Sequence, residues 1–274
     1  MPARRVLMLS YHYTPVINGG VERSARFARY LPEFGCTPVV ITTRRYGTGE
    51  GRLGERVIRT GEMHNIPFLK RTGAQGDSKR AMQRPQVEAR ETAGRRSPLV
   101  EWVLKWLMIP DDKIRWASCA FPPALRLLRR GEADVIYSTS PPESSHLLGM
   151  VLKGLTGKPW IMDLRDPWTF EPLKRYIREP GLRLSIEKRL EKACFKHSDI
   201  VIANTQEAGE RYRTLYPKYA GKVRVITNGF DGDEMAAAAS AFSHEGPFRG
   251  IGDDVFLVSH VGTFSRYTYE GAYP

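Results

Sequence analysis

The sequence predicts an α/β fold built on a doubly wound, Rossmann-like parallel sheet. Short apolar, β-branched segments alternate along the chain with longer segments of helical periodicity. The apolar segments at 133–140 and 199–205 lack the strict alternation of a half-exposed strand. Parallel strands that helices cover on both faces have this composition. Ligands of such a fold bind at the carboxyl ends of the strands, so the segments that follow the strands are the first places to look for a site.

The order of the expected elements supports this fold class. A strand at 5–10, a glycine-containing loop at 11–20 and a helix at 21–35 lead into a second strand at 38–43, which makes a β-α-β unit. Gly35 is placed to end the helix. The further expected elements are a short strand at 55–61, a basic loop at 70–97, an amphipathic helix at 98–110, a helix at 114–130, a strand at 133–140, a helix at 143–157, a strand at 159–164, a helix at 180–198, a strand at 199–205, a helix at 205–217 capped by Thr205, and a strand at 222–229.

Composition narrows the choice of partners and compartment. The chain has 274 residues and a net charge of +12, which favours anionic partners such as nucleic acid, an acidic membrane or phosphorylated substrates. Its three cysteines are far apart and form no C-x-x-C pair, so zinc and redox motifs have no support and a reducing, cytoplasmic compartment is expected. No apolar run approaches the roughly 18 residues that a membrane-spanning helix needs.

The domain organisation changes near residue 231. We expect one domain over 1–231, a linker rich in alanine and glycine over 232–253, and the start of a second domain over 254–274. The last segment contains a new apolar strand and a glycine turn but no helix to cover them. It is therefore interpreted as an incomplete α/β unit.

A glycine pair lies between the first strand and the first helix. Gly19 and Gly20 would allow the backbone to approach a ligand closely, and free N–H groups at a helix N-terminus suit a phosphate. Glu22 follows in the same stretch and is counted among the candidate binding residues. A flexible turn is the alternative explanation, and the spacing does not meet the dinucleotide fingerprint G-x-G-x-x-G.

Small hydroxyl residues end the strand at 133–140. Ser138, Thr139 and Ser140 are expected at the carboxyl end of the sheet, where they could bind sugar hydroxyls or phosphate. His146 falls in the first turn of the next helix and is a candidate catalytic residue, with a structural role as the alternative. Plain capping of that helix by Glu143 or Ser144 is the competing explanation for the polar residues here.

The stretch PWIMDLRDPW, at 159–168, places charges at the end of an apolar strand. Asp163 lies within the strand, where an unpaired carboxylate would be costly, and Arg165 is the partner type expected for it. Arg165, Asp166 and Trp168 are expected to emerge at the strand end. The stretch is either one side of a functional cleft or an internal ion pair that shapes the loop.

Several of these segments together resemble one family. The stretches SYHYTPVINGGVERSARFARYLPEFGCTPVVIT, DVIYSTSPPESSHLLGMVLKGLTGKPWIMDLRDPW, DIVIANTQEAGERYRTLYP and KVRVITNGFD occur in this order. Together they resemble the N-terminal, acceptor-binding half of glycosyltransferase family 4, the retaining nucleotide-sugar enzymes with a GT-B fold. The resemblance covers about residues 5–231, with a trace at 254–265.

The resemblance implies two Rossmann-like domains that face each other across a cleft. Gly19 and Gly20 correspond to the loop that approaches the donor diphosphate, and Asn228, Gly229 and Asp231 to the segment that leads into the second domain. Asn204, near the carboxyl end of the strand expected at 199–205, is a further candidate binding residue. Many members carry a histidine where this sequence has Ser138, Thr139 and Ser140. Either Arg165 and Asp166 take over its polar role, or this branch of the family does not need it.

The implied partners are a nucleotide sugar and a glycan, lipid-linked or small acceptor, with no metal and no other cofactor. The family's E-x7-E motif and its diphosphate-binding basic residues belong to the second domain, beyond residue 274, so the chain alone is expected to be inactive. The alternative is a non-catalytic module that binds sugar or rests on an acidic membrane through residues 70–97, Trp102 and Trp106. Nucleic-acid binding is not expected, because no aromatic-basic platform or helix-turn-helix is visible.

Overall fold

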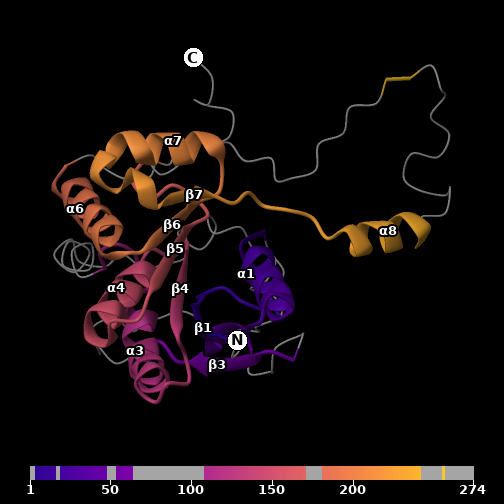
Figure 1. Ribbon diagram of the computed structural model, residues 1–274, viewed down its shortest axis with the longest axis horizontal. Helices are drawn as coiled ribbons and strands as arrows, with labels where there is room; N and C mark the ends of the chain where they lie inside the picture. Colours follow the sequence, from indigo (N-terminus) through magenta and orange to yellow (C-terminus); the bar gives the residue numbers. More distant parts are fainter. Residues whose placement is uncertain are drawn as a thin grey trace, which may run out of the picture. The chain divides into compact units, whose positions relative to one another are not determined.

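The computed structural model describes residues 4–16, 19–47, 54–63, 108–170, 181–241 and 255–256. Seven strands form one sheet in the order β3-β2-β1-β4-β5-β6-β7, and every neighbouring pair is parallel (Figure 1). The strands are β1 (Arg4–Leu9), β2 (Cys36–Thr43), β3 (Arg56–Thr60), β4 (Val135–Ser140), β5 (Trp160–Leu164), β6 (Ile200–Ala203) and β7 (Val223–Val225). This order confirms the doubly wound α/β prediction. The chain adds β2 and β3 on one side of β1 and β4 to β7 on the other, so the topological switch point lies between β1 and β4.

Helices cover both faces of the sheet. The described helices are α1 (Gly19–Tyr30), α3 (Ile114–Arg129), α4 (Ser144–Thr156), α6 (Leu182–His197), α7 (Gln206–Leu215) and α8 (Gly232–Ala241), with 3₁₀ turns η1 (Leu31–Phe34), η2 (Arg44–Tyr46) and η5 (Pro217–Lys222). One core cluster joins Val6 and Met8 to Ala25 and Ala28 of α1. The other joins alternate strand residues, such as Leu7, to buried residues of α3, α4, α6 and α7. We call these two sides the α1 face and the α4 face.

Local sequence signals define several helix ends as predicted. Gly35 and Gly157 both have positive φ angles of about 68° and 67° and end η1 and α4. Only glycine adopts this left-handed conformation without strain. The side chain of Thr205 accepts a hydrogen bond from the backbone N–H of Ala208, so the predicted cap of α7 is confirmed.

Other boundaries differ from the prediction. The helix expected at 21–35 begins at Gly19 and changes to a 3₁₀ turn at Leu31, because Pro32 cannot continue the hydrogen-bonding pattern of an α-helix. The strand expected at 222–229 spans only Val223–Val225. The predicted basic loop at 70–97, residues 98–107 of the helix predicted at 98–110, and most of the strand at 254–265 lie outside the described residues. The last three residues of that predicted helix, 108–110, are described and are not helical.

The chain divides into two compact units, Met1–Thr227 and Asn228–Pro274. The sheet lies wholly in the first unit. In the second unit, Asp231 accepts hydrogen bonds from the backbone N–H groups of Asp233 and Glu234 and so caps α8. Helix formation in 232–241 was not expected for a linker, although its alanines favour a helix.

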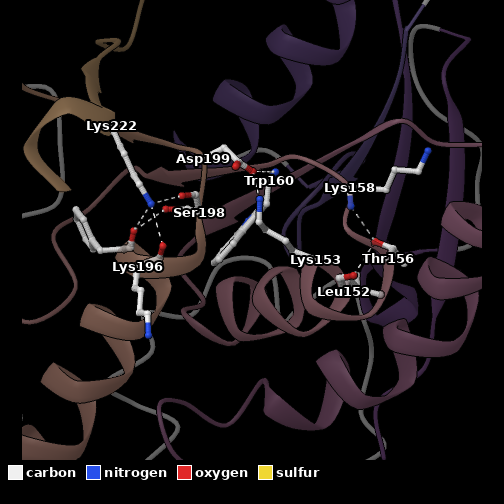
Figure 2. A network of polar contacts seen from close by, with 10 residues as sticks. Leu152, Lys153, Thr156, Lys158, Trp160, Lys196, Ser198, Asp199 and Lys222 are labelled. Carbon is white, nitrogen blue, oxygen red and sulfur yellow. Dashed lines mark hydrogen bonds and ion pairs between the residues drawn. The ribbon is translucent and has the colours of Figure 1, made fainter. Parts of the chain in front are cut away.

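A polar network holds the amino ends of β5 and β6 (Figure 2). The Asp199 carboxylate accepts a hydrogen bond of 2.7 Å from the backbone N–H of Trp160 and pairs with Lys153 of α4. Lys222 donates to the backbone carbonyls of Phe195, Lys196 and Ser198, at 3.1, 2.9 and 2.6 Å. These contacts lie at the opposite end of the sheet from the candidate site.

Candidate functional site at the carboxyl edge of the sheet

The candidate site lies where β1, β2, β4 and β5 end. Parallel strands bring their carboxyl ends to one edge. In doubly wound folds, ligands bind at this edge beside the switch point, which here lies between β1 and β4. The segments that follow these strands begin at Ser10, Arg44, Pro141 and Arg165.

A buried ion pair links α1 to β5 on the α1 face. The Arg23 guanidinium donates to both Asp163 oxygens, with Nη2 to Oδ1 at 2.8 Å and Nε to Oδ2 at 3.0 Å. The hydroxyls of Tyr137 and Thr139 on β4 donate to the same carboxylate at 2.6 and 3.0 Å. The exposed fraction of the two charged side chains is 3% and 0%. The carboxylate is therefore fully surrounded by donors.

The expected Asp163–Arg165 pair is wrong. Asp163 pairs with Arg23, whereas Arg165 pairs with its neighbour Asp166 at 2.7 Å. The physical reason is that β5 ends at Leu164, so Arg165 lies beyond the strand and does not share the face of Asp163. Sequence reasoning missed Arg23, although a carboxylate in mid-strand indicates that some buried cation must exist.

Arg23 also reaches the end of the first unit. Its guanidinium donates to the backbone carbonyls of Ile226 and Thr227 at 2.8 and 3.2 Å. The same residue thus joins α1, β5 and the segment that leads away from β7. Because Gly19 and Gly20 form the first turn of α1, this pairing holds the glycine pair at the carboxyl edge.

The hydroxyl groups of Ser138, Thr139 and Ser140, which were predicted to form one binding site, do not point to the same side of the sheet. Ser138 points to the α4 face, where its hydroxyl lies 2.8 Å from Nδ1 of His146 and accepts a 2.8 Å hydrogen bond from the indole of Trp160. Thr139 points to the α1 face, as the alternation of a strand requires. The Ser140 hydroxyl is buried and has no hydrogen-bond partner among the described residues.

His146 and Trp168 are core residues. Both are fully buried, and their rings lie 6.3 Å apart. The backbone N–H of Trp168 donates to the hydroxyl of Tyr212 at 3.0 Å. Trp168 does not emerge at the strand end as predicted, because its indole belongs to the buried core cluster of the α4 face. The geometry supports the structural alternative for His146.

The cap of α4 comes from a distant segment. Asp111 accepts hydrogen bonds from the backbone N–H and hydroxyl of Ser144, at 2.9 and 2.5 Å, so capping by Glu143 is wrong. Burial, and then the charge of Glu143, raises the pKa of Asp111 to about 6. Sequence reasoning missed Asp111, since 33 residues separate it from the helix it caps.

A second group that sequence reasoning missed surrounds His12. The His12 ring stacks on Tyr46 with the ring centres 5.6 Å apart. Burial, together with the positive charges of Lys113, Arg165 and Arg45, lowers the pKa of His12 to about 4. His12 is thus neutral near pH 7, and three cations from three separate segments face it. The only signal in the sequence is its place directly after β1.

The partly exposed charges of the edge occur in sequential pairs. Arg165 and Asp166 have exposed side-chain fractions of 21% and 41%. Lys113 pairs with Asp112 at 2.6 Å, and the Lys113 ammonium lies 5.4 Å from the centre of the Tyr11 ring. In both pairs the carboxylate is the more exposed partner, so the acids face the solvent while the cations lie deeper.

The remaining predicted residues lie at separate points of the edge. Glu22 pairs with Arg26 of the same helix at 3.6 Å. Asn204 follows β6, and its amide oxygen is buried with no hydrogen-bond partner among the described residues. Asn228 is exposed and is the first residue of the second unit. The described residues include no group of three or more side chains that could hold a metal ion.

Two further sequence-level expectations concern membranes and thiols. No helix in the described ranges has the length and apolar character needed to cross a bilayer. Cys36, Cys119 and Cys194 are all free thiols. Trp102 and Trp106, which were considered for membrane contact, lie outside the described residues.

Comparisons with known proteins show which family the chain is similar to. A family model described as Glycosyltransferase Family 4 matches residues 17–234. A search of curated proteins finds no match. Similar solved structures include HepE of Anabaena in complex with UDP and glucose (15% identity, TM-score 0.44), MurG of Acinetobacter baumannii (12%, 0.40) and the calicheamicin glycosyltransferase CalG4 (12%, 0.48). The matched regions include 90%, 84% and 84% of this chain, in the same order. They include only 55%, 47% and 54% of the respective solved chains, so this chain spans about half their length.

Proposed function

Because the chain belongs to glycosyltransferase family 4, we propose that it forms the acceptor-binding part of an enzyme that transfers sugar from a nucleotide-sugar donor. The transfer retains the configuration at the anomeric carbon, and the acceptor is a glycan, a lipid-linked sugar or a small hydroxyl compound. The reaction needs no metal or other cofactor. The free thiols fit a cytoplasmic enzyme.

One observation supports this proposal most directly. His12, Lys113 and Arg165 belong to three segments far apart in sequence, and they meet at the carboxyl edge next to the switch between β1 and β4. Such an edge is where doubly wound folds bind their ligands. The positive charges of Lys113 and Arg165 complement the negative charge of a nucleotide diphosphate. The His12 ring is neutral near pH 7, so it does not change the charge of the site.

The proposed reaction divides its tasks among these residues. The bond between the anomeric carbon and the donor phosphate breaks, and a new bond forms from that carbon to an acceptor hydroxyl oxygen. The acceptor proton leaves with the departing diphosphate or passes to a base. We assign Asp166 to hold the acceptor hydroxyl, Arg165 and Lys113 to stabilise the developing negative charge, and the first turn of α1 to approach the diphosphate.

The first test uses the longest protein that the gene encodes, because this chain spans about half the length of the solved structures it resembles. Purified protein is incubated with a panel of nucleotide sugars and acceptors, and the anomeric configuration of any product is read by NMR. A product with retained configuration supports the proposal. Donor binding without transfer to any acceptor of the panel favours a non-catalytic module.

Asp166→Asn is the sharpest variant at this site. The amide keeps the size of the side chain but removes the charge that would hold the acceptor, so kcat/KM should fall by roughly 10²–10³. The control is Glu33→Gln, which removes one negative charge from the exposed turn η1. Thermal unfolding of both variants should match that of the wild type. Transfer at the wild-type rate in Asp166→Asn would assign this carboxylate a structural role.

A further inference from the structure

The outer surface of the α4 face has an unusual charge distribution. Helices α3 and α4 contain no acidic residue, and the two acids of α6, Glu187 and Glu191, are fully buried. The three helices lie side by side along one side of the sheet (Figure 1). Their exposed cations are Arg126, Arg129, Lys188, Arg189, Lys192 and Lys196. We call this set the basic face.

The cations of the basic face are not used to hold the fold. Within the described ranges, none of these six side chains forms a hydrogen bond or an ion pair through its charged group. By contrast, the inward cations of the same helices are engaged: Lys153 pairs with Asp199, and Arg183 pairs with Glu187. The fold therefore separates structural cations from cations that are left for a partner.

Apolar side chains are exposed in the middle of the basic face. Val151 and Leu155 lie one turn apart on α4, the central helix of the three, and their exposed fractions are 47% and 52%. Isolated exposed apolar residues are ordinary. Here, however, they lie between helices that expose cations on either side, which is the composition of surfaces that rest on acidic lipid.

The elements next to the basic face expose acidic side chains as well as basic ones. On α7, the next helix after α6, Glu207 and Glu210 are both exposed. On the other side of the sheet, the charges of α1 are mixed, and Glu22 pairs with Arg26. Positive charge is therefore not spread evenly over the described surface.

We propose that the basic face docks the protein on the surface of an anionic bilayer. Charge complementarity to acidic headgroups supplies the attraction, while Val151 and Leu155 enter the interfacial region. The proposal does not depend on the proposed reaction, and it uses none of the residues assigned to the candidate site. A bilayer is favoured over nucleic acid because exposed aliphatic side chains at the centre of a phosphate-binding surface would contribute nothing.

The test is vesicle co-sedimentation of the full chain. The probes are vesicles of phosphatidylcholine alone and of phosphatidylcholine with phosphatidylglycerol. We expect binding only to the anionic vesicles, with loss at high salt because surface charges are then screened. Lys188→Gln/Arg189→Gln/Lys192→Gln should weaken the partition coefficient by roughly 100-fold, since each basic residue near an acidic surface contributes about a factor of five.

The matched control is Arg4→Gln/Arg211→Gln/Lys218→Gln. It removes the same charge from exposed positions outside α3, α4 and α6, so it should bind anionic vesicles within a few-fold of the wild type. Val151→Ser/Leu155→Ser should also weaken binding, which separates insertion from pure charge attraction. Thermal unfolding and transfer to a water-soluble acceptor should be unchanged in all three variants.

Three outcomes would overturn the proposal. The first is failure of the wild-type protein to sediment with the anionic vesicles at low salt. The second is equal loss of binding in the two triple variants, which would mean that only total charge matters. The third is RNA binding that depends on Lys188, Arg189 and Lys192 without any binding to vesicles, which would assign the basic face to nucleic acid.

Discussion

At the scale of single residues, the Arg23–Asp163 pair organises the α1 face of the candidate site. Both side chains are buried, and the carboxylate also accepts from Tyr137 and Thr139. Removal of charge from water is costly, so such a pair is retained only with nearly complete hydrogen bonding. The pair therefore positions α1, with its glycine turn, against the end of β5.

A double-mutant cycle tests this role. Arg23→Met leaves a buried carboxylate without its cation, and Asp163→Asn leaves a buried guanidinium without its anion. Each single variant should lower the free energy of unfolding by about 3–5 kcal/mol. The double variant should lose clearly less than the sum, because neither charge is then left alone. Urea denaturation of the four proteins measures the coupling, and additive losses would show that the pair does not act as a unit.

At the scale of the elements, α6 depends on a cation from outside the helix. Its last carbonyl groups have no partners within the helix, as at every helix C-terminus. The ammonium group of Lys222 satisfies three carbonyls at this end, those of Phe195, Lys196 and Ser198 (Figure 2). A positive charge at this position also opposes the helix dipole. The contact joins α6 to the start of β7.

Lys222→Met should therefore destabilise the protein by about 2 kcal/mol, which is typical for loss of hydrogen bonds to a charged group. Lys218→Met is the control, because Lys218 lies in the same turn η5 but is exposed and caps no carbonyl among the described residues. Urea denaturation with tryptophan fluorescence is the measurement. Equal loss in both variants would mean that the apolar substitution itself, and not the cap, is responsible.

At the scale of the whole molecule, two partly buried groups give the free energy of unfolding opposite dependences on pH. His12 has a folded-state pKa of about 4, below its ordinary 6.5, so its contribution is complete above pH 6.5 and is lost as the pH falls toward 4. Asp111 has a folded-state pKa of about 6, above its ordinary 3.8, so its contribution is present below pH 3.8 and is lost as the pH rises through 6. The two effects partly cancel near pH 5.

The variant His12→Gln removes the titrating group, so comparison with the wild type isolates the contribution of His12 to the pH dependence of stability. The difference in unfolding free energy between wild type and His12→Gln should grow as the pH rises from 4 to 6.5, by at most ~3 kcal/mol. Asp111→Asn should give a difference that changes in the opposite direction over the same range. Urea denaturation at several pH values measures both, and the other titrating groups cancel in each difference. Parallel stability curves for wild type and His12→Gln would contradict the depressed pKa.

The fold follows from patterns that repeat along the chain. Alternating apolar strands and amphipathic helices identified the parallel α/β sheet, and glycine or threonine signals located the ends of η1, α4 and α7. These particular signals are local, because Gly35, Gly157 and Thr205 lie within a few positions of the backbone groups that they cap, and the apolar character of a buried strand is contained in the strand itself. The family could be predicted for the same reason, since its segments recur in a fixed order.

The partners of charged side chains were decided by the tertiary structure. Asp163 was assigned to Arg165, two residues away, but its partner is Arg23, 140 residues away. Asp111 caps α4 from 33 residues away, and the cations around His12 come from three separate segments. The basic face likewise exists only because α3, α4 and α6 lie on one side of the sheet. Electrostatic contacts depend on distance in space and on burial, which appear only when the sheet brings distant segments together.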